Sequence, residues 1–410
     1  MRIAFISPEF VTEPTFSGGL ANYLARVSRA LKNDGHDVHV LTRSQNQDAP
    51  TVDYHGVTVH RVVPLWDHRM VLDHIDPLVP RPHYNFYQDI KAAWCLRRRW
   101  KQLNREKEFD LVQAANVSAC GFFFRSEKHT PIVTRLSSYR PLWDTLSGAD
   151  INSGLRLRWK FEQKAIEGTR YHYAPSDFVA RETQDHYRVG GVDVIETPFF
   201  REVPKPDASY YNDHLAGKDY LLYFGQHNRM KGTHLIGEAL AQVLDRHPSL
   251  HCVFAGKDSN LAPDGGSMRA YIRRLNEDHI DRLHFAEPLR HEQLYPVIEN
   301  SIAVLTPSLA DNLPNTCLES MGLGKTVIAA TGSCFEQLIT HGENGFLARN
   351  CDAESLASTI NHVLALTPEA RVIVGAHARE TIGRLHPDKA IPRLIDYYAS
   401  VIDGFNSRRN

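Results

Sequence analysis

Short apolar runs alternate with amphipathic stretches along most of the chain. The run RIAFISPEF, which starts at Arg2, is rich in apolar residues and predicts a strand. The stretch after it has an apolar side chain at every third or fourth position, which predicts an amphipathic helix. These positions are Leu20, Tyr23, Leu24, Val27 and Leu31. DVHVLTR then predicts a second strand, so the chain opens with a βαβ unit.

The same alternation continues through two halves of the chain. The runs FDLVQAA, PIVTRLSS, YHYAPS and VDVIETPFF predict further strands of the first half. A polar stretch with two prolines, residues 201–218, predicts a connection between domains. Strands then restart at DYLLYFG, LHCVFAG, RLHFAE and IAVLTPS. The pattern predicts an α/β protein with two Rossmann-like, doubly wound parallel-sheet domains at 1–203 and 204–387.

A glycine pair, Gly18 and Gly19, lies at the turn between the first strand and the first helix. Glycine lets the backbone approach a ligand closely, and the helix start that follows favours an anion. The spacing G-x-G-x-x-G is absent, so a dinucleotide site is weakly indicated. The alternative is a turn that needs positive φ and nothing more.

A pair of acids, Asp311 and Glu319, follows the strand IAVLTPS. Pro314 suits the first turn of a helix, so Glu319 shares one helix face with Asn315 and Thr316. The free N–H groups at the helix start favour a phosphate or a sugar hydroxyl, and the acids suit hydroxyl donors. The alternative is that Glu319 forms a surface ion pair and Asp311 is a solvated loop acid.

This stretch resembles the signature of the retaining glycosyltransferases of family 4, the group 1 or glycogen synthase-like enzymes with the GT-B fold. The resemblance lies in D-x7-E from Asp311 to Glu319, the following MGLGK and TGSCFEQLI, and the Pro-Asn pair at 314–315. It implies two domains facing a cleft and a last helix, about 388–410, that crosses back to complete the N-terminal acceptor-binding domain. It also implies that Asp311 holds hydroxyls of the donor sugar and Glu319 holds the nucleotide ribose. The family has Glu at the first position, so Asp311 is one methylene shorter.

A second element, GQHNRMKG, resembles the family's G-R-L-x-x-x-K-G. The resemblance implies that Lys231 holds the donor diphosphate, as the family's Lys does. Gln226 stands at the family's Arg position, and Arg229 is close enough to substitute for it. Gly18 and Gly19 match a loop that meets the diphosphate and the acceptor. Fixed positive charge at the departing nucleoside diphosphate is the chemistry that such a reaction needs. No His aligns cleanly with a family His near Arg135, Leu136 and Ser137.

Composition narrows the setting. The formal net charge of −1 provides no field for recruiting nucleic acid. No D-x-D pair and no H-E-x-x-H occurs, so we expect neither an essential metal nor another cofactor. Six cysteines without metal-like spacing, and no secretory leader, indicate the cytoplasm. A basic helix around Arg97–Lys107 could also touch the inner face of a membrane, although a solvated helix face explains it too.

The resemblance therefore implies a hexosyltransferase that moves sugar from a nucleotide-diphosphate sugar, by prior a UDP-sugar, to a hydroxyl acceptor. The acceptor is expected to be a glycan or lipid-linked glycan of polysaccharide biosynthesis. Three alternatives stay open at this point. They are a nucleotide-sugar epimerase of the same fold, a glycoside hydrolase using Asp311 and Glu319, and a two-lobed binding protein without chemistry.

Overall fold

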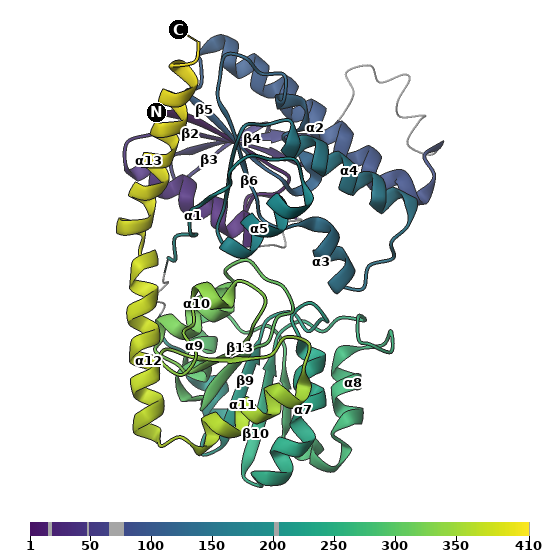
Figure 1. The fold of residues 1–410 in the computed structure, drawn as a ribbon, viewed down its shortest axis with the longest axis vertical. Coiled ribbons are helices and arrows are strands. Elements are labelled where there is room, and N and C mark those ends of the chain that lie inside the picture. Colours follow the sequence, from purple (N-terminus) through teal and green to yellow (C-terminus); the bar gives the residue numbers. More distant parts are fainter. Residues whose placement is uncertain (15–18, 47–48, 65–77, 201–204, 410) are drawn as a thin grey trace. The chain divides into compact units, whose positions relative to one another are not determined.

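The computed structural model describes residues 1–14, 19–46, 49–64, 78–200 and 205–409 (Figure 1). The chain forms two compact units. The N-terminal unit comprises Met1–Leu142, Asp150–Pro198 and Pro387–Asn410. The C-terminal unit comprises Trp143–Ala149 and Phe199–His386.

An eight-stranded sheet in the order β3-β4-β2-β1-β5-β6-β7-β8 forms the centre of the N-terminal unit. Its strands are β1 (Arg2–Ser7), β2 (Asp37–Arg43), β3 (Thr51–Tyr54), β4 (Val57–Val62), β5 (Leu111–Ala115), β6 (Ile132–Arg135), β7 (Tyr171–Ala174) and β8 (Asp193–Val194). Neighbouring strands pair in parallel, except that β3 and β4 form an antiparallel hairpin. The predicted strand VDVIETPFF forms only the two residues of β8, since the segment after it leaves the sheet.

Helices cover both faces of this sheet (Figure 1). They are α1 (Gly19–Asn33), α2 (Arg81–Glu106), α4 (Ser153–Glu167), α5 (Asp177–His186) and α13 (Pro387–Asn406). A further helix, α3 (Arg140–Leu146), spans the boundary between the units. The long last helix α13 is joined to the sheet by Tyr398, which donates a hydrogen bond to the side-chain oxygen of Gln113 on β5. The same oxygen accepts from Tyr173 on β7.

The C-terminal unit has a six-stranded, wholly parallel sheet in the order β11-β10-β9-β12-β13-β14. Its strands are β9 (Asp219–Phe224), β10 (Leu250–Ala255), β11 (Leu283–Ala286), β12 (Ala303–Thr306), β13 (Val327–Ala330) and β14 (Phe346–Ala348). Its helices are α6 (Ser209–His214), α7 (Thr233–Arg246), α8 (Met268–Leu275), α9 (His291–Asn300), α10 (Asn315–Gly322), α11 (Ala353–Ala365) and α12 (Pro368–Ile382). The helix α6 lies within the stretch predicted as a connection. Both Rossmann-like sheets of the predicted α/β fold are confirmed.

Strand order in the C-terminal sheet reverses at β9, since β10 lies on one side of it and β12 on the other. At such a switch point the loops that leave the two outer strands diverge, and open α/β sheets bind ligands in the resulting crevice. The loops after β9, β10 and β12 are therefore the ones in which to look for a site.

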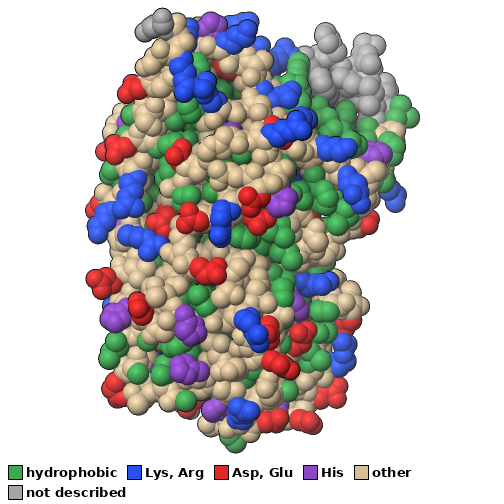
Figure 2. Space-filling view, viewed as in Figure 1, with side chains coloured by type: hydrophobic (Ala, Val, Ile, Leu, Met, Phe, Trp, Pro, Cys, Tyr) green, Lys and Arg blue, Asp and Glu red, His purple; other side chains and the backbone are tan. Residues whose placement is uncertain are grey.

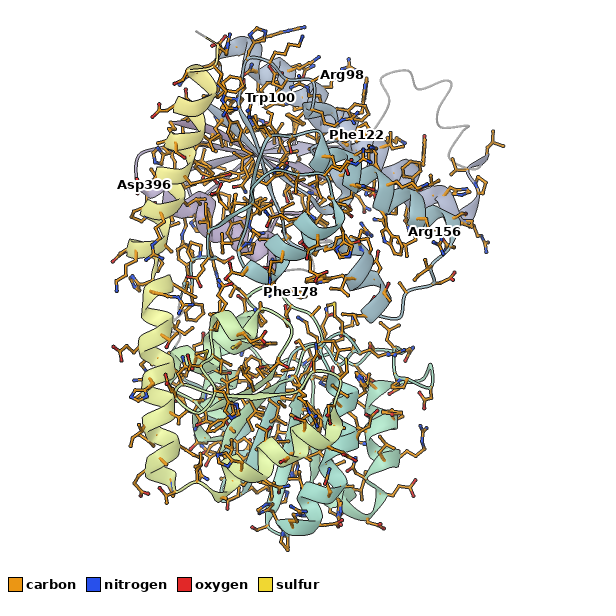
Figure 3. The ribbon with its side chains drawn as sticks, in the orientation of Figure 1. Arg98, Trp100, Phe122, Arg156, Phe178 and Asp396 are labelled. Atoms are coloured by element: carbon orange, nitrogen blue, oxygen red, sulfur yellow. The ribbon has the colours of Figure 1, made fainter. Side chains whose placement is uncertain are left out.

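The predicted basic helix is present as the second half of α2, but one of its cations is not exposed. Arg97 is buried, forms an ion pair with Glu127 at 2.5 Å and lies over the Trp100 ring. This ion pair corrects the expectation that Arg97 belongs to an open basic face. Figure 3 labels Arg98 on the same helix, which is exposed.

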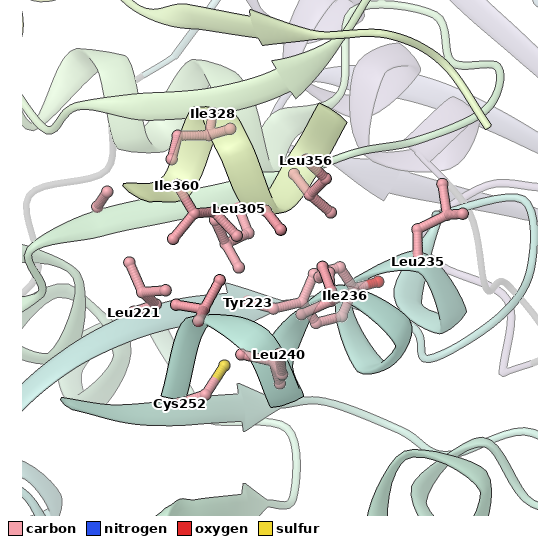
Figure 4. Close-up of a cluster of buried hydrophobic side chains, with 14 of the residues drawn as sticks. Leu221, Tyr223, Leu235, Ile236, Leu240, Cys252, Leu305, Ile328, Leu356 and Ile360 are labelled. Atoms are coloured by element: carbon pink, nitrogen blue, oxygen red, sulfur yellow. The ribbon is translucent and has the colours of Figure 1, made fainter. Parts of the chain in front are cut away.

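A buried layer between α7, α11 and the C-terminal sheet predicts which substitutions unfold that unit (Figure 4). Leu240 is 0% exposed within this layer, so Leu240→Ala should lower the free energy of unfolding by about 2–5 kcal/mol. Leu275→Ala on α8, at a side chain 39% exposed, is the matched control and should cost far less. Urea unfolding of the full chain measures both, and similar losses would contradict the assignment of this core.

Candidate functional site

The start of α10 carries most of the predicted binding residues. The buried strand β12 ends at Thr306, and Pro314 with extended backbone (φ −67°, ψ 133°) precedes the helix. Pro314 has no side-chain acceptor, and no side chain caps this end of α10. The backbone N–H groups of Asn315 and Thr316 therefore point out of the helix start, as predicted, because the first turn has no intrahelical acceptors. Gly324, at φ +74°, follows the end of the helix.

A cavity of about 360 Å³ lies beside this helix start, at the carboxyl ends of β9 and β10. It is lined by Phe224, Gly225, Gln226, Ala255, Gly256, Lys257, Pro288, Leu289, His291, Leu294, Asn315, Thr316 and Glu319. Four residues predicted from the sequence thus line one cavity, namely Gln226, Asn315, Thr316 and Glu319. The combination of apolar walls with a few polar groups is typical of a small-molecule site.

The Glu319 side chain is mostly buried in the wall of this cavity. The residue is 8% exposed, and its Oε1 lies 3.6 Å from Nε2 of His291 at the start of α9. Sequence reasoning missed His291, and it also missed Lys257 after β10. The available signal was positional, because each lies shortly after a predicted parallel strand, where ligand-binding loops occur.

Two glycines leave part of the cavity wall without side chains. Gly225 (φ +125°) and Gly256 (φ +155°) directly follow the neighbouring strands β9 and β10. A Cβ atom on Gly256 would lie 1.8 Å from the carbonyl oxygen of Gly225. The two strand ends can approach this closely only with glycine at position 256, and the approach leaves backbone groups at the cavity surface. The sequence signal was a Gly closing each of the runs YFG and FAG.

Lys231 and Asp311 form a separate pair beyond the cavity lining. Lys231 Nζ lies 2.5 Å from Asp311 Oδ2. The Asp311 backbone N–H donates to Ser333 Oγ at 2.9 Å, and its other carboxylate oxygen accepts from the N–H of Asn312. Asp311 is 8% exposed, so the alternative of a solvated loop acid is wrong. The structure therefore places the predicted catalytic residues in two groups, the Glu319 cavity and the Lys231–Asp311 pair.

The remaining predicted residues lie outside both groups. Arg229 is exposed and forms no ion pair with any described carboxylate. Gly19 opens α1 in the N-terminal unit, and Gly18 lies outside the described residues. Within the described ranges, no cluster of three or more His, Cys, Asp or Glu side chains is arranged to hold a metal ion. Five of the six cysteines are buried and Cys351 is exposed, all of them free thiols.

Comparison with known families decides the identity. The family described as "Glycosyl transferases group 1" matches residues 211–381, and "Glycosyltransferase Family 4" matches residues 17–199. The chain belongs to the group 1, family 4 glycosyltransferases. Together the two matches take in most of both compact units.

Relatives agree with this assignment along the whole chain. The transferase is 24% identical to the D-inositol 3-phosphate glycosyltransferase of Nocardiopsis dassonvillei, over 93% of this chain and 89% of the relative. Its structure resembles sucrose-phosphate synthase of Thermosynechococcus elongatus with a TM-score of 0.75 and 19% identity, covering 98% and 99% of the two chains. It also resembles HepE of Anabaena in complex with UDP-glucose, with a TM-score of 0.67, 18% identity and coverage of 98% and 100%. These likenesses confirm the GT-B fold. Across the part of the transferase that the structure describes, no helix is both long and apolar enough to span a membrane.

The loop that carries Lys231 predicts a sensitive glycine. Gly232 has φ +69°, and a Cβ atom there would lie 1.9 Å from the carbonyl oxygen of Pro307. We expect Gly232→Ala to lower the free energy of unfolding by more than the about 1–3 kcal/mol of an unfavourable φ alone. Gly217→Ala is the matched control, because Gly217 has φ +75° with nothing within 4 Å. Equal losses of stability in urea unfolding would disprove the close approach of the two loops.

His227, next to the cavity loop, predicts a dependence of stability on pH. Burial, with the charge of Arg269 as a second cause, lowers the pKa of His227 from 6.5 to about 4. Neither ring nitrogen has a hydrogen-bond partner among the described residues, so the ring is buried in its neutral form. The folded protein then binds this proton less readily than the unfolded chain, and the free energy of unfolding falls as the pH drops from about 6.5 to 4.

The matched pair His227→Phe and His214→Phe tests this dependence by urea unfolding at several pH values. His214 is exposed on α6. We expect the loss of stability between pH 6.5 and 4 to be smaller in His227→Phe and unchanged in His214→Phe. An unchanged loss in His227→Phe would show that His227 is not the group responsible.

Proposed function

We propose that this glycosyltransferase transfers a hexosyl group from a UDP-sugar to a hydroxyl of a glycan or lipid-linked glycan, with retention of anomeric configuration and without an essential metal. One observation carries the proposal. The Glu319 side chain and the open helix start at Asn315 and Thr316 line the same cavity. A carboxylate accepts hydrogen bonds from ribose hydroxyls, and open backbone N–H groups donate hydrogen bonds to a phosphate. A nucleoside diphosphate offers both.

The cavity walls fit the nucleoside part of such a donor. The bare backbone at Gly225 and Gly256 permits a flat base to lie close, and Pro288 and Leu294 supply apolar contact. Glu319 would accept from the ribose hydroxyls, as the family resemblance implies. Its neighbour His291 would hold the carboxylate in place from the side.

Charge around the diphosphate would come from several sources. Lys257 lines the cavity, and neither Lys257 nor Arg229 pairs with a described carboxylate. Lys231 is already neutralised by Asp311 at 2.5 Å. We infer that sugar hydroxyls hydrogen-bond to Asp311, so that Lys231 becomes available to the departing diphosphate as charge develops there. The pair would then couple binding of the sugar to stabilisation of the leaving group.

The chemical step follows from these roles. The acceptor oxygen bonds to the anomeric carbon as the bond between that carbon and the diphosphate oxygen breaks. The departing diphosphate takes the acceptor proton on the same face, which gives retention without a protein nucleophile. Positive charge at Lys231 and Arg229 and the helix-start amides would offset the charge on the leaving group.

The wider setting is proposed on the same basis. The HepE structure is described as a complex with UDP-glucose, and the Nocardiopsis relative is described as a D-inositol 3-phosphate glycosyltransferase. The first description supports a sugar-nucleotide donor, and the second supports an acceptor that carries hydroxyl groups. We propose that 204–387 binds the donor, and that 1–203 with the last helix and the Gly18–Gly19 loop binds the acceptor. We place the enzyme in the cytoplasm. There the exposed cations of α2, which do not include the buried Arg97, could contact the inner face of a membrane.

A glycoside hydrolase is a weaker candidate. It needs two carboxyl groups facing one scissile bond. Glu319 lines the cavity, but Asp311 does not and is bound to Lys231. An epimerase of the same fold would need no acceptor, so products formed from the donor alone distinguish it.

Product analysis tests the proposal. We expect UDP to be released from UDP-glucose when an acceptor glycan is present, and NMR to show the new glycosidic bond with the donor's anomeric configuration. Addition of EDTA should leave the rate unchanged. Conversion of UDP-glucose to another sugar without acceptor would favour the epimerase, and an inverted product would exclude the same-face mechanism.

Two conservative variants separate the roles of the acids. Glu319→Gln should chiefly raise the KM for the donor by about 10–100-fold, since it weakens charged hydrogen bonds to the ribose. Asp311→Asn should chiefly lower kcat, because it removes the partner that couples the sugar to Lys231. Glu354→Gln, at an exposed position on α11, is the control. Small and equal effects of both site variants would contradict the proposed roles.

A further inference from the structure

A second cavity lies within the N-terminal unit, at the edge of the sheet where β6 and β7 begin. It encloses about 230 Å³. It is lined by Phe124, Arg125, Glu127, Lys128, Thr130, Ile132, Gly168, Thr169, Arg170, Tyr171, Phe405, Arg408 and Arg409. Because Ile132 and Tyr171 are the first residues of their strands, this edge is opposite to the carboxyl ends. None of the proposed roles in transfer uses this cavity.

The cavity gathers positive charge without matching negative charge. Five of its side chains are cationic and only Glu127 is acidic. Glu127 is already paired with Arg97 at 2.5 Å, and its Oε1 accepts from the backbone N–H groups of Lys128 and His129. Among the described residues no carboxylate pairs with any of the five cations, which are Arg125, Lys128, Arg170, Arg408 and Arg409. Lys and Arg side chains also gather on the visible surface of this end of the unit, near the C-terminus (Figure 2).

Two of the cations are held in place by their surroundings. The stem of Arg125 packs on Gly168, where a Cβ atom would lie 2.2 Å from Arg125 Cδ. Its guanidinium lies 3.6 Å from the centroid of the Phe122 ring, and its Nε donates to the Phe122 carbonyl oxygen at 2.9 Å. Arg409 donates to the carbonyl oxygen of His129 at 3.2 Å. Side chains that are ordered before a ligand arrives lose less entropy when it binds.

The dimensions and charges select a class of ligand. Buried Phe124, Thr130 and Ile132 close the floor, so the cations stand around a small volume. Arginine and lysine around such a volume suit an anion with several oxygens and more than one negative charge. A carboxylate has a single charge, whereas a diphosphate or a phosphate ester offers multiple charges in a compact form.

We propose that this cavity is a phosphate-binding site, separate from the donor cavity and specific for a compact ligand with at least two negative charges. The phosphate could belong to a soluble diphosphate or phosphate monoester, or to the terminal phosphate monoester of a phospholipid headgroup. Because Phe405, Arg408 and Arg409 belong to the end of the chain that follows and completes α13, the ligand fixes this end against β6 and β7.

The first test uses inorganic pyrophosphate as the probe, with the full chain at physiological salt. Hydrogen–deuterium exchange should slow at residues 124–132 and 405–409 on binding. Lys128→Ala/Arg170→Ala should weaken binding by at least about tenfold, since it removes two charged contacts. Lys389→Ala/Arg393→Ala on α13 removes the same charge from exposed positions outside the cavity and should bind as the wild type does.

The second arm distinguishes the two sources of phosphate. Vesicles of phosphatidic acid, whose headgroup is a phosphate monoester, in phosphatidylcholine are sedimented with the wild type and both double variants. Loss of sedimentation only in Lys128→Ala/Arg170→Ala assigns the lipid headgroup, and binding of pyrophosphate alone assigns a soluble ligand. Absence of binding to both probes, protection elsewhere in the chain, or equal loss in both double variants overturns the proposal. Transfer from UDP-glucose is unaffected by either outcome, so failure here is distinct from failure of the proposed function.

Discussion

The candidate site depends on the direct backbone contact between the loops that follow β9 and β12. The N–H of Leu309 donates to the carbonyl oxygen of Met230 at 2.8 Å, and Gly232 leaves no room for a side chain beside Pro307. Lys231 comes from one loop and Asp311 from the other, so this contact brings their charges together. The topology makes this contact possible, because β9 and β12 are neighbours at the strand-order reversal.

The cations of the two proposed sites have different surroundings. Lys231 is paired with Asp311, which avoids an isolated positive charge at a half-buried lysine. The five cations of the second cavity are exposed, and within the described ranges no carboxylate pairs with them. Solvent can screen them, so folding tolerates the repulsion, but an anion that excludes this solvent gains from all of them. The Lys231–Asp311 pair suits a positive charge that acts only when sugar is bound. The cations of the second cavity suit a site that can bind an anion at any time.

The sequence predicts what depends on local spacing. Glu319, Asn315 and Thr316 share a helix face because they are three and four positions apart, and the structure places all three on one cavity. Contacts between distant segments were beyond such reasoning. Lys231 and Asp311 are 80 positions apart, and His291 reaches Glu319 only because β11 and β12 lie in the same sheet. The sequence predicted Arg97 to be part of a basic helix face, because its partner Glu127 lies 30 positions further along the chain.

The central claim is that the cavity at the start of α10 binds the nucleoside diphosphate of the donor. Hydrogen–deuterium exchange of the full chain with and without UDP, in EDTA, tests it most directly. The account predicts slower exchange at residues 225–232 and 315–319, where the ligand would cover the strand-end loop and the open helix start. Unchanged exchange in both segments at saturating UDP, or protection that appears only when Mg²⁺ is added, would contradict it.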